Sequence, residues 1–165
     1  MFTRSNHIAQ MNIAGALILL IILLPLTGFG QGYIGLSKKQ VRRALEKQAA
    51  ANDTIHIVLA ETDSSIHYSF RDLHFLPADF IYNFDKNGKC NEEIVIANCD
   101  SCFYKYLQKA VDRKKIGWKK LKENLYISSY VKKMMLEIRV DIPHSFVIRR
   151  MKWNRQVYNT LLTSK

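Results

Sequence analysis

Apolar and polar residues alternate along this chain in a pattern that predicts two helices, each followed by several strands. The first helix is expected to begin at residue 37, because Ser37 and Gln40 have the spacing of a capping box. Apolar residues then recur at the interval of one helix face, at Val41, Ala44, Leu45 and Ala49. This helix should end within residues 50–53.

Strands should follow, because short runs of alternating or continuous apolar residues occupy residues 55–60, 66–71, 80–84 and 90–97. Between the last two runs, Asn87 and Gly88 favour a type I′ hairpin turn, since both residue types tolerate positive φ. That turn would place Phe84 opposite Asn91 and Phe80 opposite Val95.

The same order recurs in the second half of the chain. Asp100 is suited to the N-cap of a second helix, and its apolar face should be formed by Phe103, Tyr106, Leu107, Ala110 and Val111. Further strands are expected at 118–121, 125–130, 134–140 and 146–153, before a terminal helical turn capped by Asn154.

Residues 41, 44 and 45 match residues 103, 106 and 107 in spacing, at an offset of 62. This match suggests a structural duplication, with halves 35–97 and 98–153. The sequence therefore predicts an α+β fold in which one antiparallel sheet carries both helices on one face. The open face should then carry polar and basic side chains.

The N-terminal residues predict export. Residues 13–29 contain no charge, but their apolar run is shorter than the roughly 20 residues of a membrane-spanning helix. Gly28 and Gly30 are small residues at the −3 and −1 positions of a cleavage site before Gln31. We therefore expect a signal peptide at 1–30, a single domain at 31–165, and a periplasmic or secreted protein with no integral membrane span.

An uncleaved anchor is the alternative. Basic residues follow the apolar run closely, and such flanks tend to stay on the cytoplasmic side: Lys38, Lys39, Arg42 and Arg43. In that case, residues 13–29 would hold the protein in the inner membrane.

Charge is distributed unevenly along the chain, whose formal net charge is +11. Residues 31–99 hold eight Lys or Arg and nine Asp or Glu, whereas residues 100–165 hold sixteen and five. A basic surface in the second half would attract an acidic protein, a glycan or an anionic membrane. If the protein is exported, nucleic acid is the least expected partner. Alternatively, long cationic side chains only cover helix and strand exteriors.

Aromatic and basic residues are interleaved near the C-terminus, where the candidate contacts for an anionic partner are Arg149, Arg150, Lys152, Trp153 and Arg155. An exposed Trp between cations would suit an interface. The alternative is a core Trp beneath a basic strand edge, which discourages strand-to-strand aggregation.

Cys99 and Cys102 form a Cys-x-x-Cys motif between an apolar strand and a helix, the setting used by thioredoxin-like oxidoreductases. A helix N-terminus favours the thiolate that thiol exchange requires, and Pro143 could stand for the cis-proline of that family. However, Asn98 occupies the usual aromatic position, and a long antiparallel meander precedes the motif. In the structural alternative, Cys99 pairs with Cys102, or Cys90 pairs with either one.

Other chemistry finds little support in the sequence. The histidines His56, His67, His74 and His144 are scattered, so no zinc site and no cofactor are expected. There is no nucleophile elbow and no Gly-rich phosphate loop. Glu92 and Glu93 are adjacent on a strand, so they face opposite sides and cannot act as a pair. We therefore predict a protein that is not an enzyme.

The run GLSKKQV at residues 35–41, just after the signal segment, resembles small exported bacterial proteins of the β-lactamase-inhibitor-protein type. It also resembles the small lipoproteins of outer-membrane assembly machinery, although here no cysteine precedes Cys90 to carry a lipid. The resemblance extends over residues 35–45 and the order of elements. Proteins of both families bind other proteins, so the resemblance implies a non-enzymatic macromolecule-binding module.

Overall fold

The computed structural model describes residues 32–51, 57–70 and 77–163, all within one compact unit, Gly32–Lys165. The expected signal peptide, together with His56 and His74, lies outside the described residues. Along the chain the elements are α2 (Lys38–Ala50), β1 (Ile57–Glu61), β2 (Ser65–Phe70), β3 (Ala78–Phe84), β4 (Cys90–Ala97), α3 (Asp100–Val111), β5 (Lys119–Lys122), β6 (Leu125–Ile127), β7 (Met134–Ile138), β8 (Ser145–Arg150) and α4 (Arg155–Thr163).

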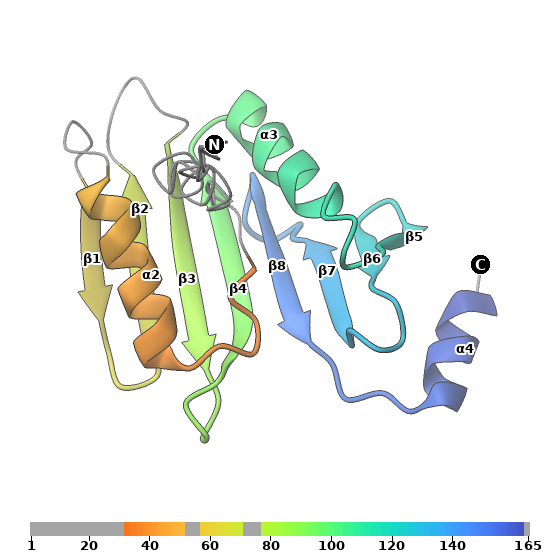
Figure 1. Cartoon of the computed structure of the whole chain (residues 1–165). Coiled ribbons are helices and arrows are strands. Elements are labelled where there is room, and N and C mark those ends of the chain that lie inside the picture. The colour runs from red at the N-terminus through yellow and green to blue at the C-terminus, as the bar shows by residue number, and fades with distance from the viewer. Residues whose placement is uncertain (1–31, 52–56, 71–76, 164–165) are drawn as a thin grey trace, which may run out of the picture. The chain divides into compact units, whose positions relative to one another are not determined.

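The strands form one eight-stranded sheet in the order β1-β2-β3-β4-β8-β7-β6-β5 (Figure 1). Every neighbouring pair is antiparallel. One helix and four strands therefore occur twice along the chain, and the last strands of the two halves, β4 and β8, pair at the centre. The α+β prediction is confirmed.

The helices α2 and α3 cover the same face of this sheet (Figure 1). Phe80, Val95 and Phe146 are directly aligned on β3, β4 and β8, so they share that face. From α3, the Tyr106 ring lies edge-on to Phe80 at 5.3 Å and the Phe103 ring lies 6.3 Å from Phe146. The apolar stripe read from the sequence is therefore the stripe that packs on the sheet.

The first helix begins as predicted. The Ser37 side chain accepts a hydrogen bond from the Gln40 N–H, and the Gln40 side chain accepts one from the Ser37 N–H. Val41 and Leu45 are buried against the sheet. Just before the helix, the Tyr33 ring contacts Tyr82 of β3 edge-on at 5.1 Å, which fixes the approach of the chain to α2.

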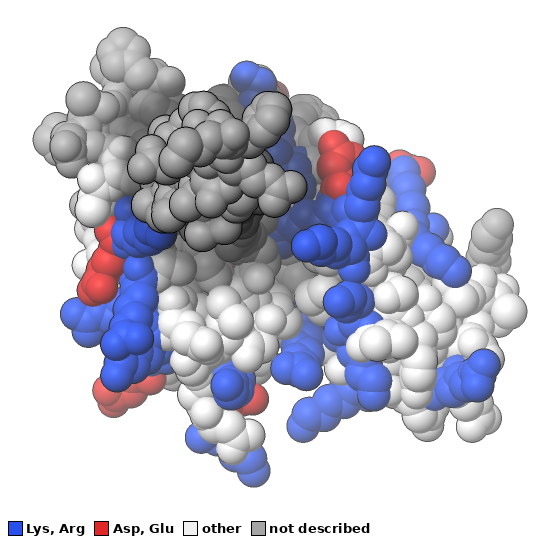
Figure 2. All heavy atoms as spheres, viewed as in Figure 1, with Lys and Arg blue, Asp and Glu red and all other residues white. Residues whose placement is uncertain are grey.

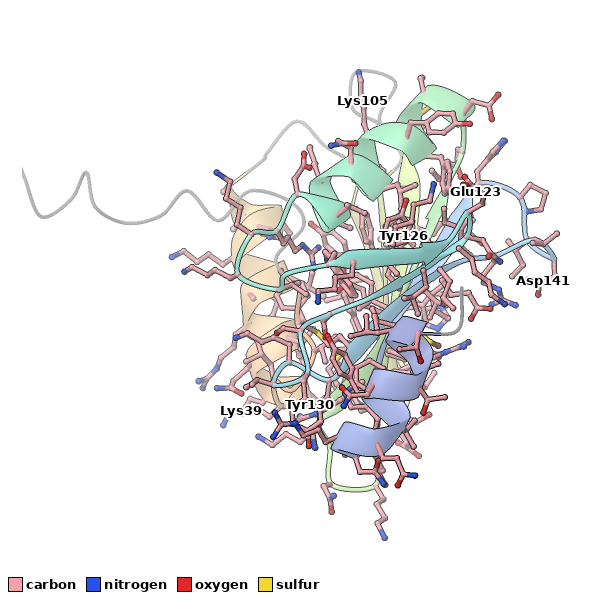
Figure 3. All side chains as sticks on the ribbon, turned by 90° about the vertical axis from the view of Figure 1, so that its right-hand side faces the viewer. Lys39, Lys105, Glu123, Tyr126, Tyr130 and Asp141 are labelled. Carbon is pink, nitrogen blue, oxygen red and sulfur yellow. A yellow bond between two sulfur atoms is a disulfide. The ribbon has the colours of Figure 1, made fainter. Side chains whose placement is uncertain are left out.

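The terminal helix α4 packs on the opposite face, at the β6 end of the sheet (Figure 3). Ile127, Trp153 and Tyr158 form a buried cluster there, and the Tyr158 hydroxyl donates to the Ser128 carbonyl at 3.1 Å. The predicted cap is present, since the Asn154 carboxamide oxygen accepts from the Val157 N–H at 2.8 Å. The helix is longer than the single turn expected, because Tyr158 anchors it to the sheet.

The β3–β4 hairpin differs from the expected turn. Gly88 has φ of 66°, but Asn87 is not among the described residues with positive φ. The Asp85 N–H donates to the Lys89 carbonyl, and Gly88 follows a type I turn, as in three-residue hairpin loops. A register shift then pairs Phe84 with Cys90 instead of Asn91, whereas Phe80 pairs with Val95 as predicted.

The face turned away from α2 and α3 is not predominantly basic, contrary to the sequence prediction. Its central row aligns Ile81, Ile94 and Val147, and these side chains are half-buried or buried. The neighbouring row aligns Glu92 with Arg149, so a basic residue there is matched by an acidic one.

Candidate binding surface of the second half

Helix α3 presents lysines to solvent because its apolar stripe faces the sheet. Phe103, Tyr106 and Ala110 are buried, so the residues on the far side of the helix face solvent. Lys105 and Lys109 are both exposed, and Lys105 projects from α3 away from the sheet (Figure 3). The ammonium group of Lys109 also lies 5.8 Å from the centre of the Tyr106 ring.

The segment after α3 continues this row of cations. The helix ends at Asp112, and Lys114 and Lys115 are exposed in the connection to β5. The Trp118 indole N–H donates to the Ala110 carbonyl at 2.9 Å, which ties the start of β5 to α3. We call the exposed cations of α3 and the following connection the lysine surface: Lys105, Lys109, Lys114 and Lys115.

The positive charge of the lysine surface is not neutralised within the described part of the chain. None of its members has a carboxylate within ion-pair distance there, whereas the neighbouring Lys120 binds Glu123 at 2.8 Å. Asp112 accepts a hydrogen bond from Gln108 at 2.7 Å instead. Blue side chains accordingly outnumber red ones over the region of α3 and β5 (Figure 2). Such a surface attracts anionic molecules.

The C-terminal candidates do not form one exposed group. Arg149 is held by Glu92 and by Glu137, the latter at 3.1 Å, and Trp153 is only 4% exposed. Trp153 thus lies in the core beneath α4, and it is not an exposed interfacial residue. Arg150, Lys152 and Arg155 remain exposed, with no ion pair among the described residues.

A hollow of ≈310 Å³ lies where β3, β4 and β8 approach the hairpin, and it is lined by Ser64, Asn83, Phe84, Asn91, Glu92, Arg149 and Arg150. Two of its three charged groups, Glu92 and Arg149, are already engaged. The Asn83 amide donates to the Glu92 carboxylate at 2.8 Å, and Arg149 binds the other oxygen of that carboxylate. The hollow therefore offers an anion less free positive charge than the lysine surface does.

Cys99 and Cys102 form a disulfide, with their Cα atoms 5.1 Å apart, and Cys90 is a buried free thiol. Cys99, not Asp100, is the N-cap of α3, because its sulfur accepts from the Cys102 N–H at 3.1 Å. Burial raises the pKa of the Cys90 thiol to about 12, so this cysteine stays protonated and unreactive at neutral pH.

The surroundings of the disulfide differ from those of thioredoxin-like enzymes. All peptide bonds of the described residues are trans, so Pro143 is not a cis-proline. The sheet beside the motif is antiparallel throughout. Next to the disulfide, His144 Nε2 lies 2.6 Å from the Asp100 carboxylate. Among the described residues, no three His, Cys, Asp or Glu side chains converge on a metal position.

The sequence analysis missed a buried acidic residue beneath the helices. The Glu93 side chain is 2% exposed, and its nearest cation, Arg113, lies 4.0 Å away. Burial raises the pKa of Glu93 in spite of that cation. The strand pattern held the signal, because Glu93 alternates with Val95 and Ala97, whose side chains face the core. Because its carboxylate is enclosed, Glu93 cannot contact a partner at the surface, and we assign it a structural role.

The described residues contain no helix long and apolar enough to span a membrane. Compared with known protein families, curated proteins and solved structures, the chain shows no match.

Proposed function

We propose that this chain is an exported, non-enzymatic module that binds an acidic macromolecule through the lysine surface. The supporting observation is a set of exposed lysines on α3 and the following connection, without acidic partners among the described residues. Long-range attraction by such a surface raises the rate of encounter with an anionic partner and falls with added salt.

An acidic protein is the favoured partner class, ahead of a glycan or an anionic membrane. The resemblance of residues 35–45 to protein-binding families supports this choice. The flexible point charges of lysine can also adapt to carboxylates spread over a protein surface. The mass of the natural protein, which would begin at Gln31 after signal cleavage, checks the export part of the proposal.

The rival function is thiol–disulfide exchange by Cys99 and Cys102. One observation favours it: the two cysteines form a disulfide at the N-terminus of α3. We propose a structural role instead, because the sheet beside the motif is antiparallel throughout and Pro143 is not a cis-proline.

Binding to model polyanions tests the lysine surface. We would compare the wild type with the variant Lys105→Gln/Lys109→Gln/Lys114→Gln/Lys115→Gln. The matched control carries the same charge change on exposed residues of the first half, as Lys39→Gln/Arg43→Gln/Lys47→Gln/Lys86→Gln. The probes are poly-glutamate, heparin and vesicles containing phosphatidylglycerol, each measured at low and high salt.

The lysine-surface variant should bind poly-glutamate at least 10-fold more weakly, while the control changes by less than about 2-fold. Tighter binding to heparin or vesicles than to poly-glutamate would replace the acidic protein by a glycan or a membrane. Equal losses in both variants would mean that net charge, not this surface, governs binding, and the proposal would fail.

A further inference from the structure

The two edges of the sheet differ in how well they resist pairing with another strand. The edge strand β5 is four residues long, carries three exposed lysines and has a register shift against β6. Short length, lysines and irregularities are the features that keep edge strands from pairing. This edge is therefore protected.

The opposite edge, β1, has five residues, no lysine and no register shift against β2 (Figure 1). Val58 is 45% exposed and Leu59 is 38% exposed. Val58 is aligned with Ser69 and Leu59 with Tyr68, so the two apolar side chains lie on opposite faces of the sheet. Within the described residues, β1 pairs with β2 alone. An edge strand of this kind leaves backbone N–H and C=O groups ready for another strand.

We propose that β1 is a dimer interface, where the β1 strands of two copies pair antiparallel about a twofold axis. The charge distribution favours a second copy of the chain as the occupant. Residues 31–99, which contain β1, hold eight basic and nine acidic residues, whereas residues 100–165 hold sixteen and five. Pairing through β1 joins the nearly neutral halves and keeps the two basic halves at opposite ends of the joined sheet. Any contact between the basic halves would be repulsive.

The sequence of β1 is compatible with pairing to itself. Glu61 is its one acidic residue, and it is already bound by Lys38 at 2.9 Å and by Arg42 at 3.5 Å. With Leu59 opposite Leu59 of the second copy, each Glu61 would lie opposite Ile57. The two carboxylates then sit at opposite ends of the paired strands, and no like charges meet. A strongly charged strand from another protein would find only one charged residue, Glu61, along β1.

Sedimentation equilibrium of the natural protein over a range of concentrations tests the dimer. Val58→Lys gives β1 the protection that β5 already has, so it should weaken dimerisation at least 10-fold. Val140→Lys is the matched control, because Val140 is 86% exposed and lies outside the strands. Circular dichroism would establish that both variants are folded.

Cross-linking provides a second measurement that does not require weakening the strand. Directly opposed residues in antiparallel strands have Cα atoms about 4.5–5.5 Å apart, which a disulfide can bridge. Leu59→Cys should therefore form a covalent dimer under mild oxidation, and Val140→Cys should not. A protein that stays monomeric at about 100 µM would overturn the proposal. So would a dimer that Val58→Lys does not weaken and that Leu59→Cys does not cross-link.

Discussion

Replacing the disulfide by Cys99→Ser/Cys102→Ala tests whether it serves mainly to stabilise the start of α3. The serine keeps an oxygen that can accept from the N–H of residue 102, as the Cys99 sulfur does at 3.1 Å. Alanine is apolar, so the buried position 102 gains no unsatisfied hydroxyl. The variant thus removes the cross-link while retaining the helix cap.

The size of the effect follows from the loop that the disulfide closes. The cysteines are three positions apart, so the loop contains four residues. The chain-entropy model then gives about 2 kcal/mol of stabilisation at 25 °C. For a domain of about 130 residues, a loss of this size lowers Tm by roughly 7 °C. Cys99→Ala/Cys102→Ala, which also removes the cap, should cost about 1 kcal/mol more.

Urea unfolding of the oxidised wild type and the two variants measures these differences. An insulin-reduction assay and poly-glutamate binding on the same samples separate stability from function. The structural role predicts no insulin reduction by the wild type and unchanged binding by the Ser/Ala variant. Equal free energies of unfolding for wild type and variant, or insulin reduction that disappears in the variant, would refute it.

Two further predictions concern the core. Glu93→Gln should stabilise the protein increasingly as pH rises above 4.5. Because the pKa of Glu93 is raised in the folded state, ionising this carboxyl group costs folding free energy, and glutamine removes that cost. Below pH 4.5 Glu93 is protonated in both the folded and the unfolded state, so the cost disappears. Urea unfolding between pH 4 and pH 8 measures this difference, and parallel pH profiles would contradict it. Trp153→Ala should cost about 3–5 kcal/mol by opening a cavity against Tyr158, whose ring lies 5.5 Å away. Trp153→Phe should cost less, because it keeps an aromatic ring in the site and removes an indole N–H that has no hydrogen-bond partner among the described residues. Equal losses would contradict this account.

Local sequence signals predicted the elements well. Side-chain periodicity is set by the geometry of helix and strand, so Phe103, Tyr106 and Ala110 could be assigned to a buried helix face without tertiary information. The capping box of Ser37 and Gln40 is equally local, since both members lie within one turn.

Features that depend on distant parts of the chain could not be predicted. The pairing of β4 with β8 joins residues far apart in sequence, and no local pattern specifies it. The burial of Trp153 required α4 to fold back onto β6. The lysine surface was visible only as a count of charges, because the direction of each side chain depends on how α3 lies on the sheet.

The central position of β8 has a consequence for synthesis. Glu92 and Arg149 meet across the β4–β8 boundary, yet they are separated by 57 residues. At about 5–20 residues per second, the ribosome needs roughly 3 to 11 seconds to add that stretch. Throughout this interval β4 of the nascent first half pairs with β3 on one side only, because β8 has not yet been made. Chaperone binding during translation, or rapid completion of the last strand, would protect the emerging protein from aggregation.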